Sequence, residues 1–256
     1  MLSFEESLRY NRHIRMKEIG LEGQLKLKAA KVLIVGMGGL GCPAGLYLAA
    51  AGVGKIGLVD YDRVELSNLQ RQVLYNSEDI GKFKVLCAKA RLAQVNPHIE
   101  IQAYPEELTA ANARTLISSY DIVLDGTDNF ATRYLINDMC LELSKPMIYG
   151  SVFQFEGQVS VFNHNHGPCY RCVFPEMPPA GLIPNCAENG VLGVIPGLVG
   201  ALQASETIQV VLGLAKDASA RLHCLNGLGL EMRSIELQKR KGCGCSKWRT
   251  RQGSNL

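Results

Sequence analysis

The chain lacks the features of secreted and membrane-spanning proteins. Met1–Arg15 is charged and polar throughout, so it does not resemble a signal sequence. A membrane span needs about 20 mostly apolar residues. The longest apolar region, Gly190–Leu214, is interrupted by glycine, proline and several polar side chains. We therefore expect a buried helix with one polar face, no membrane partner and a cytoplasmic protein.

The chain also lacks a strong charge of either sign. Its 27 Lys and Arg residues against 24 Asp and Glu residues give a formal net charge of +3. That excess is too small to indicate a nucleic-acid partner. Hydrophobic content of 47% and charged content of 20% are typical of a soluble globular protein. We find no internal repeat, linker or low-complexity tract, and we expect a single domain over residues 1–256.

Cysteines, by contrast, are numerous. Nine of them without a secretion signal argue against a disulfide framework and favour metal ligands or nucleophiles. Cys169 and Cys172 have the spacing of zinc ligands, and Cys243 and Cys245 lie near the C-terminus. Four thiolates there would close a tetrahedral site that ties the end of the chain to its central part.

The hydrophobic pattern up to Ser151 alternates between short apolar strands and helices. The expected strands are Lys31–Gly36, Lys55–Asp60, Ile99–Tyr104, Ile122–Asp125 and Met147–Ser151. The helices expected between them are Gly39–Gly52, Lys82–Val95, Ala110–Tyr120 and Asn129–Leu143. This order predicts an α/β fold, a Rossmann-like, mostly parallel sheet with helices on both faces.

The two ends of the chain differ from that pattern. Ser3–Leu27 is helical in pattern, and we interpret residues 1–28 as an arm that precedes a nucleotide-binding half over 29–151. After Ser151 the alternation favours an antiparallel extension of the same sheet over 152–256. Its expected strands are Gln158–Asn163, Arg221–Asn226 and Met232–Leu237, with a helix over Ile195–Leu212.

The first strand leads into a glycine-rich turn, Gly36-Met37-Gly38-Gly39-Leu40-Gly41. Such a turn lets the backbone approach a phosphate at a helix N-terminus. Asp60 ends the second strand, where a carboxylate accepts hydrogen bonds from ribose hydroxyls. These residues suit NAD and ATP equally.

Three charged residues favour a triphosphate with a metal. Lys84 lies in the first turn of a helix, where a cation opposes the helix dipole by about 0.3–1 kcal/mol. An anionic ligand would explain Lys84 and also Arg71, which is suited to bidentate phosphate contact. A solvated basic patch is the alternative. Asp128 follows the fourth strand and could hold Mg²⁺ among phosphates. Alternatively it caps the next helix, while Asp125 could pair with a neighbouring cation.

The chain resembles the MoeB/ThiF family, bacterial relatives of the ubiquitin-activating enzymes. The matching stretches are Arg9–Ile14, Gly36–Gly41, Asp60, Ser67–Gln72, Lys84, Leu124–Asn129, Cys169–Cys172 and Gly200–Ala204. The resemblance implies an ATP-dependent adenylyltransferase that acts on the C-terminal Gly-Gly of a ubiquitin-like sulfur carrier of the MoaD or ThiS type. It also implies a homodimer, with ATP, Mg²⁺ and Zn²⁺ as cofactors, and a role in molybdopterin or thiamine biosynthesis.

The resemblance also implies roles for individual residues. The nucleotide-binding set is Gly38, Gly39, Asp60, Ser67, Asn68, Leu69, Gln70, Arg71, Lys84, Asp128 and Asn129. The catalytic set is Arg12, Arg71, Lys84, Asp128 and Cys186. Arg12 matches an arginine that reaches the triphosphate of the opposite subunit, and Cys186 matches a cysteine that in several relatives takes part in sulfur transfer. Zinc is assigned to Cys169, Cys172, Cys243 and Cys245, although the family usually has a second C-x-x-C where this chain has Cys-Gly-Cys.

Two other functions compete with this one. An NAD-dependent oxidoreductase would use the glycine turn and Asp60, but it leaves Arg71, Lys84 and Asp128 unexplained. A non-catalytic scaffold could bind a ubiquitin-like partner and zinc, but the intact set of cations counts against it.

Overall fold

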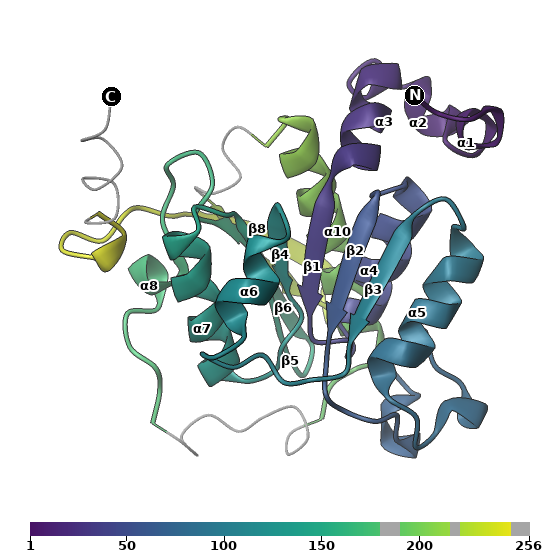
Figure 1. Ribbon diagram of the computed structural model, residues 1–256. Helices are drawn as coiled ribbons and strands as arrows, with labels where there is room; N and C mark the ends of the chain where they lie inside the picture. The colour runs from purple at the N-terminus through teal and green to yellow at the C-terminus, as the bar shows by residue number, and fades with distance from the viewer. Residues whose placement is uncertain (180–189, 216–220, 247–256) are drawn as a thin grey trace.

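The computed structural model describes residues 1–179, 190–215 and 221–246. One sheet of eight strands runs through the molecule in the order β3-β2-β1-β4-β5-β6-β7-β8 (Figure 1). The strands are β1 Lys31–Val35, β2 Lys55–Val59, β3 Glu100–Tyr104, β4 Ile122–Asp125, β5 Met147–Phe153, β6 Glu156–Phe162, β7 Arg221–Asn226 and β8 Glu231–Glu236. Strands β1 to β5 are parallel, and β6, β7 and β8 are added antiparallel. The expected fold class and the antiparallel extension are therefore confirmed.

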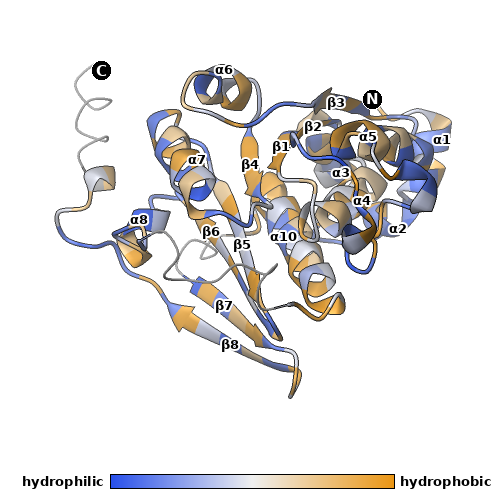
Figure 2. Cartoon of the chain, turned by 90° about the horizontal axis from the view of Figure 1, so that it is seen from below, coloured by the Kyte–Doolittle hydropathy of each residue, from blue (hydrophilic) through white to orange (hydrophobic). Residues whose placement is uncertain are grey.

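Helices cover both faces of the sheet, as Figure 2 shows. Their bounds are α4 Gly41–Ala51, α5 Lys84–Val95, α6 Ala113–Ser118, α7 Phe130–Glu142, α8 Tyr170–Val173 and α10 Val194–Leu212. Val32 and Ile34 of β1 join a buried cluster with α4, α5 and α10, whereas Leu33 and Val35 join one with α6 and α7. Successive strand residues point to opposite faces, so a strand covered on both sides is apolar throughout.

Helix α10 is long and apolar enough to cross a membrane by length and composition alone. It instead packs on α4, β5 and β6. The approach is close, because a Cβ at Gly157 would collide with Val199 and one at Gly200 with the backbone of Leu40. The expected helix is confirmed, although only 39% of its apolar window is buried.

The N-terminal arm differs from the single helix suggested by its pattern. It consists of α1 Phe4–Arg9, α2 Asn11–Ile14 and α3 Gly20–Ala29. Helix α3 begins at Gly20, whose φ of +59° is a left-handed conformation that favours glycine. The arm lies at the N-terminal ends of the strands (Figure 1), where Gly54 N–H donates to Leu27 O and Lys55 N–H donates to Ala30 O.

Candidate active site and cysteine cluster

A cleft of about 790 Å³ opens at the C-terminal ends of the parallel strands. It is lined by the last residues of β1 and β2, by the turn after β4, and by residues of β5 and β6. In open α/β sheets this edge binds ligands. The expected nucleotide residues that line the cleft are Gly38, Gly39, Asp60, Arg71, Lys84, Asp128 and Asn129.

The glycine turn follows β1. Gly36 has a φ of +91°, and a Cβ there would lie 2.6 Å from Gly126 O, so only glycine fits. Gly38 is different. Among the described residues, apart from its neighbours in the chain, only Gln72 has an atom within 4 Å of a Cβ built on Gly38, namely Nε2 at 3.7 Å. Gly38 therefore leaves space beside the cleft for a ligand.

Asp60 holds this turn from the end of β2. Its Oδ2 accepts a hydrogen bond from Met37 N–H at 2.7 Å, and its Oδ1 accepts one from Asp62 N–H at 2.8 Å. Burial raises the pKa of the Asp60 carboxyl, and the nearby Lys84 charge opposes that shift. Asp60 thus positions the turn and also presents a carboxylate to the cleft.

Lys84 is the first residue of α5 and is only 6% exposed. Its Nζ lies 2.7 Å from Asp62 Oδ2. This burial is inconsistent with a solvated basic patch at Lys84. Asp62 was not expected from the sequence, and only its place two residues after Asp60 hinted at it. Lys82 precedes the helix, is 61% exposed in its side chain, and lies 3.7 Å from Asp79.

The loop after β2 contains two short 3₁₀ helices, η1 Leu66–Asn68 and η2 Ser77–Asp79. Arg71 lines the cleft and donates from Nη1 to Ser67 O at 3.0 Å. Asn68 is buried, and its Oδ1 accepts from Glu65 N–H at 3.2 Å. The cleft lining does not include residues 67–70, which form the turn that carries Arg71.

In the turn between β4 and α7, Asp125 and Asp128 have different surroundings and therefore different roles. Asp125 is fully buried, and its Oδ2 lies 2.8 Å from Arg133 Nε. Asn129 caps α7, since its side chain accepts from Thr132 N–H at 2.9 Å. The alternative in which Asp128 caps this helix is therefore wrong. Asp128 is exposed at the cleft, where it could hold a metal ion.

Arg133 was missed as a site residue. It lines the cleft, and its Nη2 donates to Thr127 O at 2.8 Å, which fixes the turn before Asp128. The sequence carried a signal for it, because Arg133 is the one basic residue in the helix that follows Asp125.

The other end of the cleft is aromatic. Tyr149, Tyr170 and Phe174 line it, and their rings pack against one another with centroids 4.8–6.1 Å apart. Tyr149 OH donates to Ser151 Oγ at 2.7 Å and lies 3.1 Å from Gln158 Oε1. The cleft therefore joins a charged end to an aromatic end.

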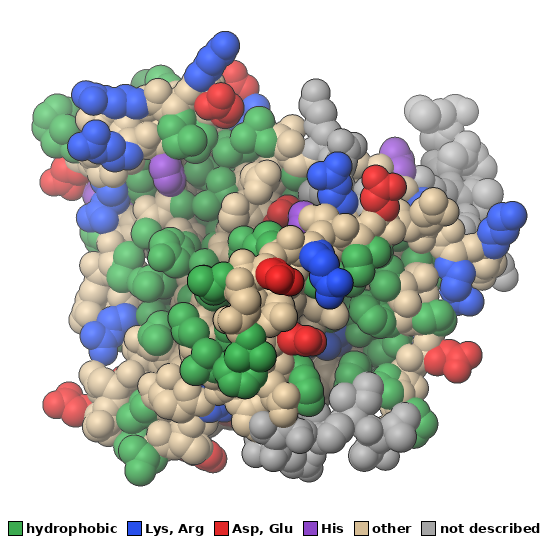
Figure 3. Space-filling view, turned by 180° about the vertical axis from the view of Figure 1, so that it is seen from behind, with side chains coloured by type: hydrophobic (Ala, Val, Ile, Leu, Met, Phe, Trp, Pro, Cys, Tyr) green, Lys and Arg blue, Asp and Glu red, His purple; other side chains and the backbone are tan. Residues whose placement is uncertain are grey.

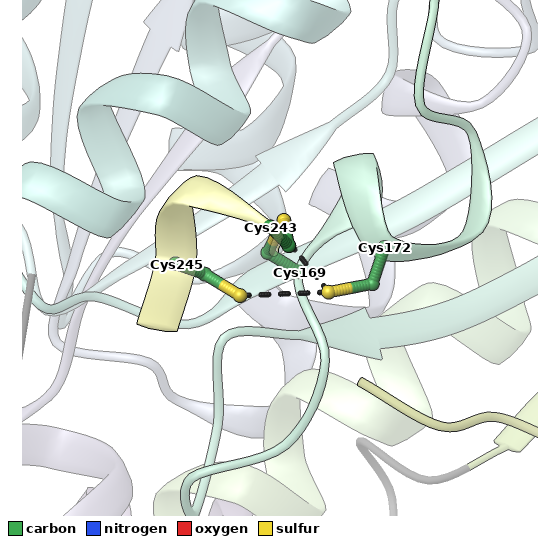
Figure 4. Close-up of side chains that lie close together, drawn as sticks. All are labelled: Cys169, Cys172, Cys243 and Cys245. Carbon is green, nitrogen blue, oxygen red and sulfur yellow. Dashed lines mark hydrogen bonds between the residues drawn. The ribbon is translucent and has the colours of Figure 1, made fainter. Parts of the chain in front are cut away.

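The cysteine cluster consists of Cys169, Cys172, Cys243 and Cys245, whose sulfur atoms all lie within 4.8 Å of one another (Figure 4). The Sγ–Sγ distances are 3.8 Å for Cys169–Cys172, 3.6 Å for Cys169–Cys243 and 3.5 Å for Cys172–Cys245. Tetrahedral zinc with Zn–S bonds of about 2.3 Å has S–S edges of about 3.8 Å. The Cys-Gly-Cys spacing thus brings both sulfurs to the cluster, which could hold a metal.

The cluster adjoins the aromatic end of the cleft through α8. Arg171, between two of the cysteines, forms a bidentate pair with Asp138 of α7 at 2.8 Å for both bonds. Tyr134, also of α7, donates from its hydroxyl to Phe174 O at 2.9 Å. The segment held by the cluster is therefore continuous with the cleft wall.

Arg12, an expected catalytic residue, does not line the cleft. Arg12 is exposed on α2, at the opposite ends of the strands, and is not among the lining residues. Cys186 lies outside the described residues.

The sequence is similar to named adenylyltransferases over most of its length. A sulfur carrier protein adenylyltransferase from Thermus thermophilus is 48% identical over 244 residues, which cover 93% of this chain and 90% of that protein. Adenylyltransferase and sulfurtransferase MOCS3 from Culex quinquefasciatus is 51% identical over 240 residues, covering 94% of this chain but 55% of that protein. The chain thus spans about half the length of the MOCS3 relatives.

Solved structures show the same fold. Escherichia coli MccB crystallised with AMPCPP and MccA has a TM-score of 0.79 at 23% identity, covering 93% of this chain and 74% of that one. PaaA has a TM-score of 0.77 at 25% identity, covering 93% and 75%. The model of the ThiF family matches residues 10–246, so the chain belongs to the ThiF family.

Proposed function

We propose that the chain is an ATP-dependent adenylyltransferase for the C-terminal Gly-Gly carboxylate of a ubiquitin-like sulfur carrier of the MoaD or ThiS type. Its products are the carrier acyl-adenylate and pyrophosphate, for molybdopterin or thiamine biosynthesis. The observation that carries this proposal is the charged end of the cleft, where Arg71, Lys84 and Asp128 lie around the glycine turn. The name of the Thermus relative supports the choice of substrate.

The chemistry needs cations more than a base. A C-terminal carboxylate has an ordinary pKa near 3.5 and is ionised at neutral pH. The obstacle is the approach of this anion to the α-phosphate of a polyanion. Arg71 and Lys84 would stabilise the charge that develops on the phosphates. Asp128 would hold Mg²⁺, which neutralises phosphate charge when bound.

The aromatic end of the cleft suits the carrier tail. Two glycines present backbone without side chains, so they could lie against the wall of the cleft that Tyr149, Tyr170 and Phe174 form. The tail carboxylate would then arrive beside the nucleotide phosphates, which is the orientation that attack requires.

We further propose that the enzyme works as a homodimer. An apolar groove runs between the arm and α10, on the face shown in Figure 3. Its apolar lining residues are Met16, Ile19, Tyr47, Ala201, Ala204, Ile208, Leu212 and Leu214. A second copy on this face would bury the groove and could bring its Arg12 to the cleft, which Arg12 of the same chain does not line.

A complementation experiment tests this arrangement. Arg12→Ala and Lys84→Ala should each lose activity as homodimers. A mixed dimer of the two variants should regain one working site. Its Arg12→Ala subunit keeps Lys84 and receives Arg12 from the Lys84→Ala subunit. If mixing restores nothing after subunit exchange has been verified, Arg12 does not act across subunits.

For the cysteine cluster we propose Zn²⁺ in a structural role, since four buried sulfurs at these distances suit a closed tetrahedral site. Free thiols and a zinc site also support a cytoplasmic location. Cys186 stays a proposed participant in later sulfur transfer. Cys186→Ser should therefore retain adenylation and lose any covalent link to the carrier.

Direct detection of the product tests the proposed function. Incubation with MgATP and a carrier should yield a carrier heavier by one adenylate in mass spectrometry. An oxidoreductase would instead bind NAD and leave the carrier unchanged. A scaffold would bind the carrier without modifying it, so either of these results contradicts the proposal.

A further inference from the structure

Two buried glutamines keep a side-chain carbonyl oxygen without a hydrogen-bond partner among the described residues, Gln72 and Gln203. Burying an unpaired amide oxygen destabilises a fold. For Gln203 the structure offers a reason. Its Nε2 donates to Asp125 O at 2.7 Å and to Ile148 O at 3.3 Å, which fastens α10 to the sheet.

Gln72 has no such structural reason. Its Oε1 is buried without a hydrogen-bond partner among residues 1–179, 190–215 and 221–246, and the residue is only 4% exposed. Its backbone is fixed, because its N–H donates to Asn68 O at 3.0 Å and its carbonyl accepts from Tyr75 N–H at 3.1 Å. The backbone therefore fixes the position from which the carboxamide extends.

The position of that carboxamide points to a ligand. Gln72 lines the cleft, and its Nε2 lies 3.7 Å from the place where a Cβ of Gly38 would stand. The second glycine of such a turn lets the backbone approach the phosphates of a nucleotide. An amide N–H₂ donates hydrogen bonds, and a phosphate only accepts them.

We propose that Gln72 is a direct nucleotide ligand whose side-chain amide donates to a phosphate oxygen of ATP beside Gly38. This inference rests on the proposed function. A hydrogen bond to an ionised acceptor in a desolvated site is stronger than one between neutral groups. The contact adds no charge, so the charge of the phosphates is still balanced by the basic side chains and the metal.

The test compares Gln72→Met with Gln203→Met. The affinity for ATP with Mg²⁺, measured by calorimetry without a carrier, should fall at least about tenfold in Gln72→Met. Affinity for adenosine, which lacks phosphates, should not change. The unliganded melting temperature should stay the same or rise, because the unpaired oxygen is gone. Gln203→Met should show the opposite, a lower melting temperature with ATP affinity within about twofold of wild type.

Different outcomes would contradict the inference about Gln72 and the proposed function on which it rests. Wild-type ATP affinity in Gln72→Met contradicts the inference, as does an equal loss for adenosine and ATP. Gln72→Glu is a second variant of similar shape, and its carboxylate should weaken ATP binding further; unchanged affinity there also overturns the assignment. Failure of the wild-type protein to bind ATP contradicts the proposed function itself.

Discussion

The charged end of the cleft and the cysteine cluster are built in opposite ways. The charged residues come from the parallel half. Partners within the chain hold two of them, since Lys84 lies 2.7 Å from Asp62 and Arg71 donates to Ser67 O. The cysteines come from two segments about 70 residues apart, and their sulfurs face one another. The fold thus preforms the first site, whereas the proposed zinc ion would hold the parts of the second together.

The two sites should also affect stability differently. Asp60 is a desolvated carboxylate and Lys84 a cation at a helix N-terminus, and neither arrangement favours folding. Four metal-bound thiolates, in contrast, would add folding free energy directly. Substitutions at the first site should therefore change activity, and those at the second should change stability.

The largest expected effect is on catalysis. Lys84→Met should lower carrier adenylation by about 10²–10³-fold, because a buried cation is lost where phosphate charge develops. Its melting temperature should change little. Lys82→Met is the matched control, since Lys82 is exposed and pairs with Asp79. Steady-state adenylation rates check both, and equal activity of the two variants would show that Lys84 has no special role.

The next effect separates stability from catalysis. Cys245→Ser should lose bound zinc and melt several degrees lower, because one of four metal ligands is gone. Cys87→Ser should keep its bound zinc and the wild-type melting temperature, since Cys87 lies outside the cluster. Metal analysis and thermal unfolding measure the two quantities. Unchanged zinc content in Cys245→Ser would remove that residue from the site.

A smaller effect is expected at Asp60. Asp60→Asn should bind ATP about tenfold more weakly, because the ribose loses a charged acceptor. Its melting temperature should change only modestly. The amide nitrogen cannot accept from a backbone N–H, so one of the bonds to Met37 and Asp62 is lost, but a buried charge that costs stability is removed as well. Calorimetry measures the ATP affinity and thermal unfolding the stability. An unchanged ATP affinity with a large loss of stability would contradict a role of Asp60 in nucleotide binding.

The smallest effect is on pH dependence. Burial raises the pKa of Asp60 above its ordinary value, so protonation begins at a higher pH than for a solvated aspartate. ATP affinity should then fall as the pH falls through that raised pKa. The unfavourable contribution of ionised Asp60 to stability is relieved over the same range, because the folded pKa exceeds the unfolded one.

The comparison with Asp60→Asn isolates this titration from that of ATP. The ratio of wild-type to variant affinity, measured from neutral pH down to about pH 4, should decline on acidification. A ratio that stays constant would mean that Asp60 keeps an ordinary pKa or does not contact the nucleotide.

The sequence predicted what depends on local pattern. Strand β1, the glycine turn and the position of Lys84 follow from hydrophobic periodicity and helix boundaries. The sheet then brings Asp60 and Asp128 to one edge, as parallel strands must. The spacing of Cys169 and Cys172 likewise indicated half of the cluster.

The remaining residues depend on tertiary contacts. Asp62 and Gln72 lie in a loop with little periodicity, and only the folded chain shows that they face Lys84 and Gly38. Asn129 and Asp128 are both good helix caps by type, so one residue of register decided which of them caps α7. The break in the arm came from Gly20, whose backbone conformation a helical pattern does not reveal.

The proposed adenylyltransferase activity is tested most directly by ATP–pyrophosphate exchange with purified MoaD-like and ThiS-like carriers in the presence of Mg²⁺. We expect exchange to require a carrier with an intact C-terminal Gly-Gly. It should disappear in Arg71→Ala and in Asp128→Ala, while both variants remain folded. If a folded, zinc-loaded protein showed no exchange with either carrier, the proposed adenylyltransferase activity would be contradicted.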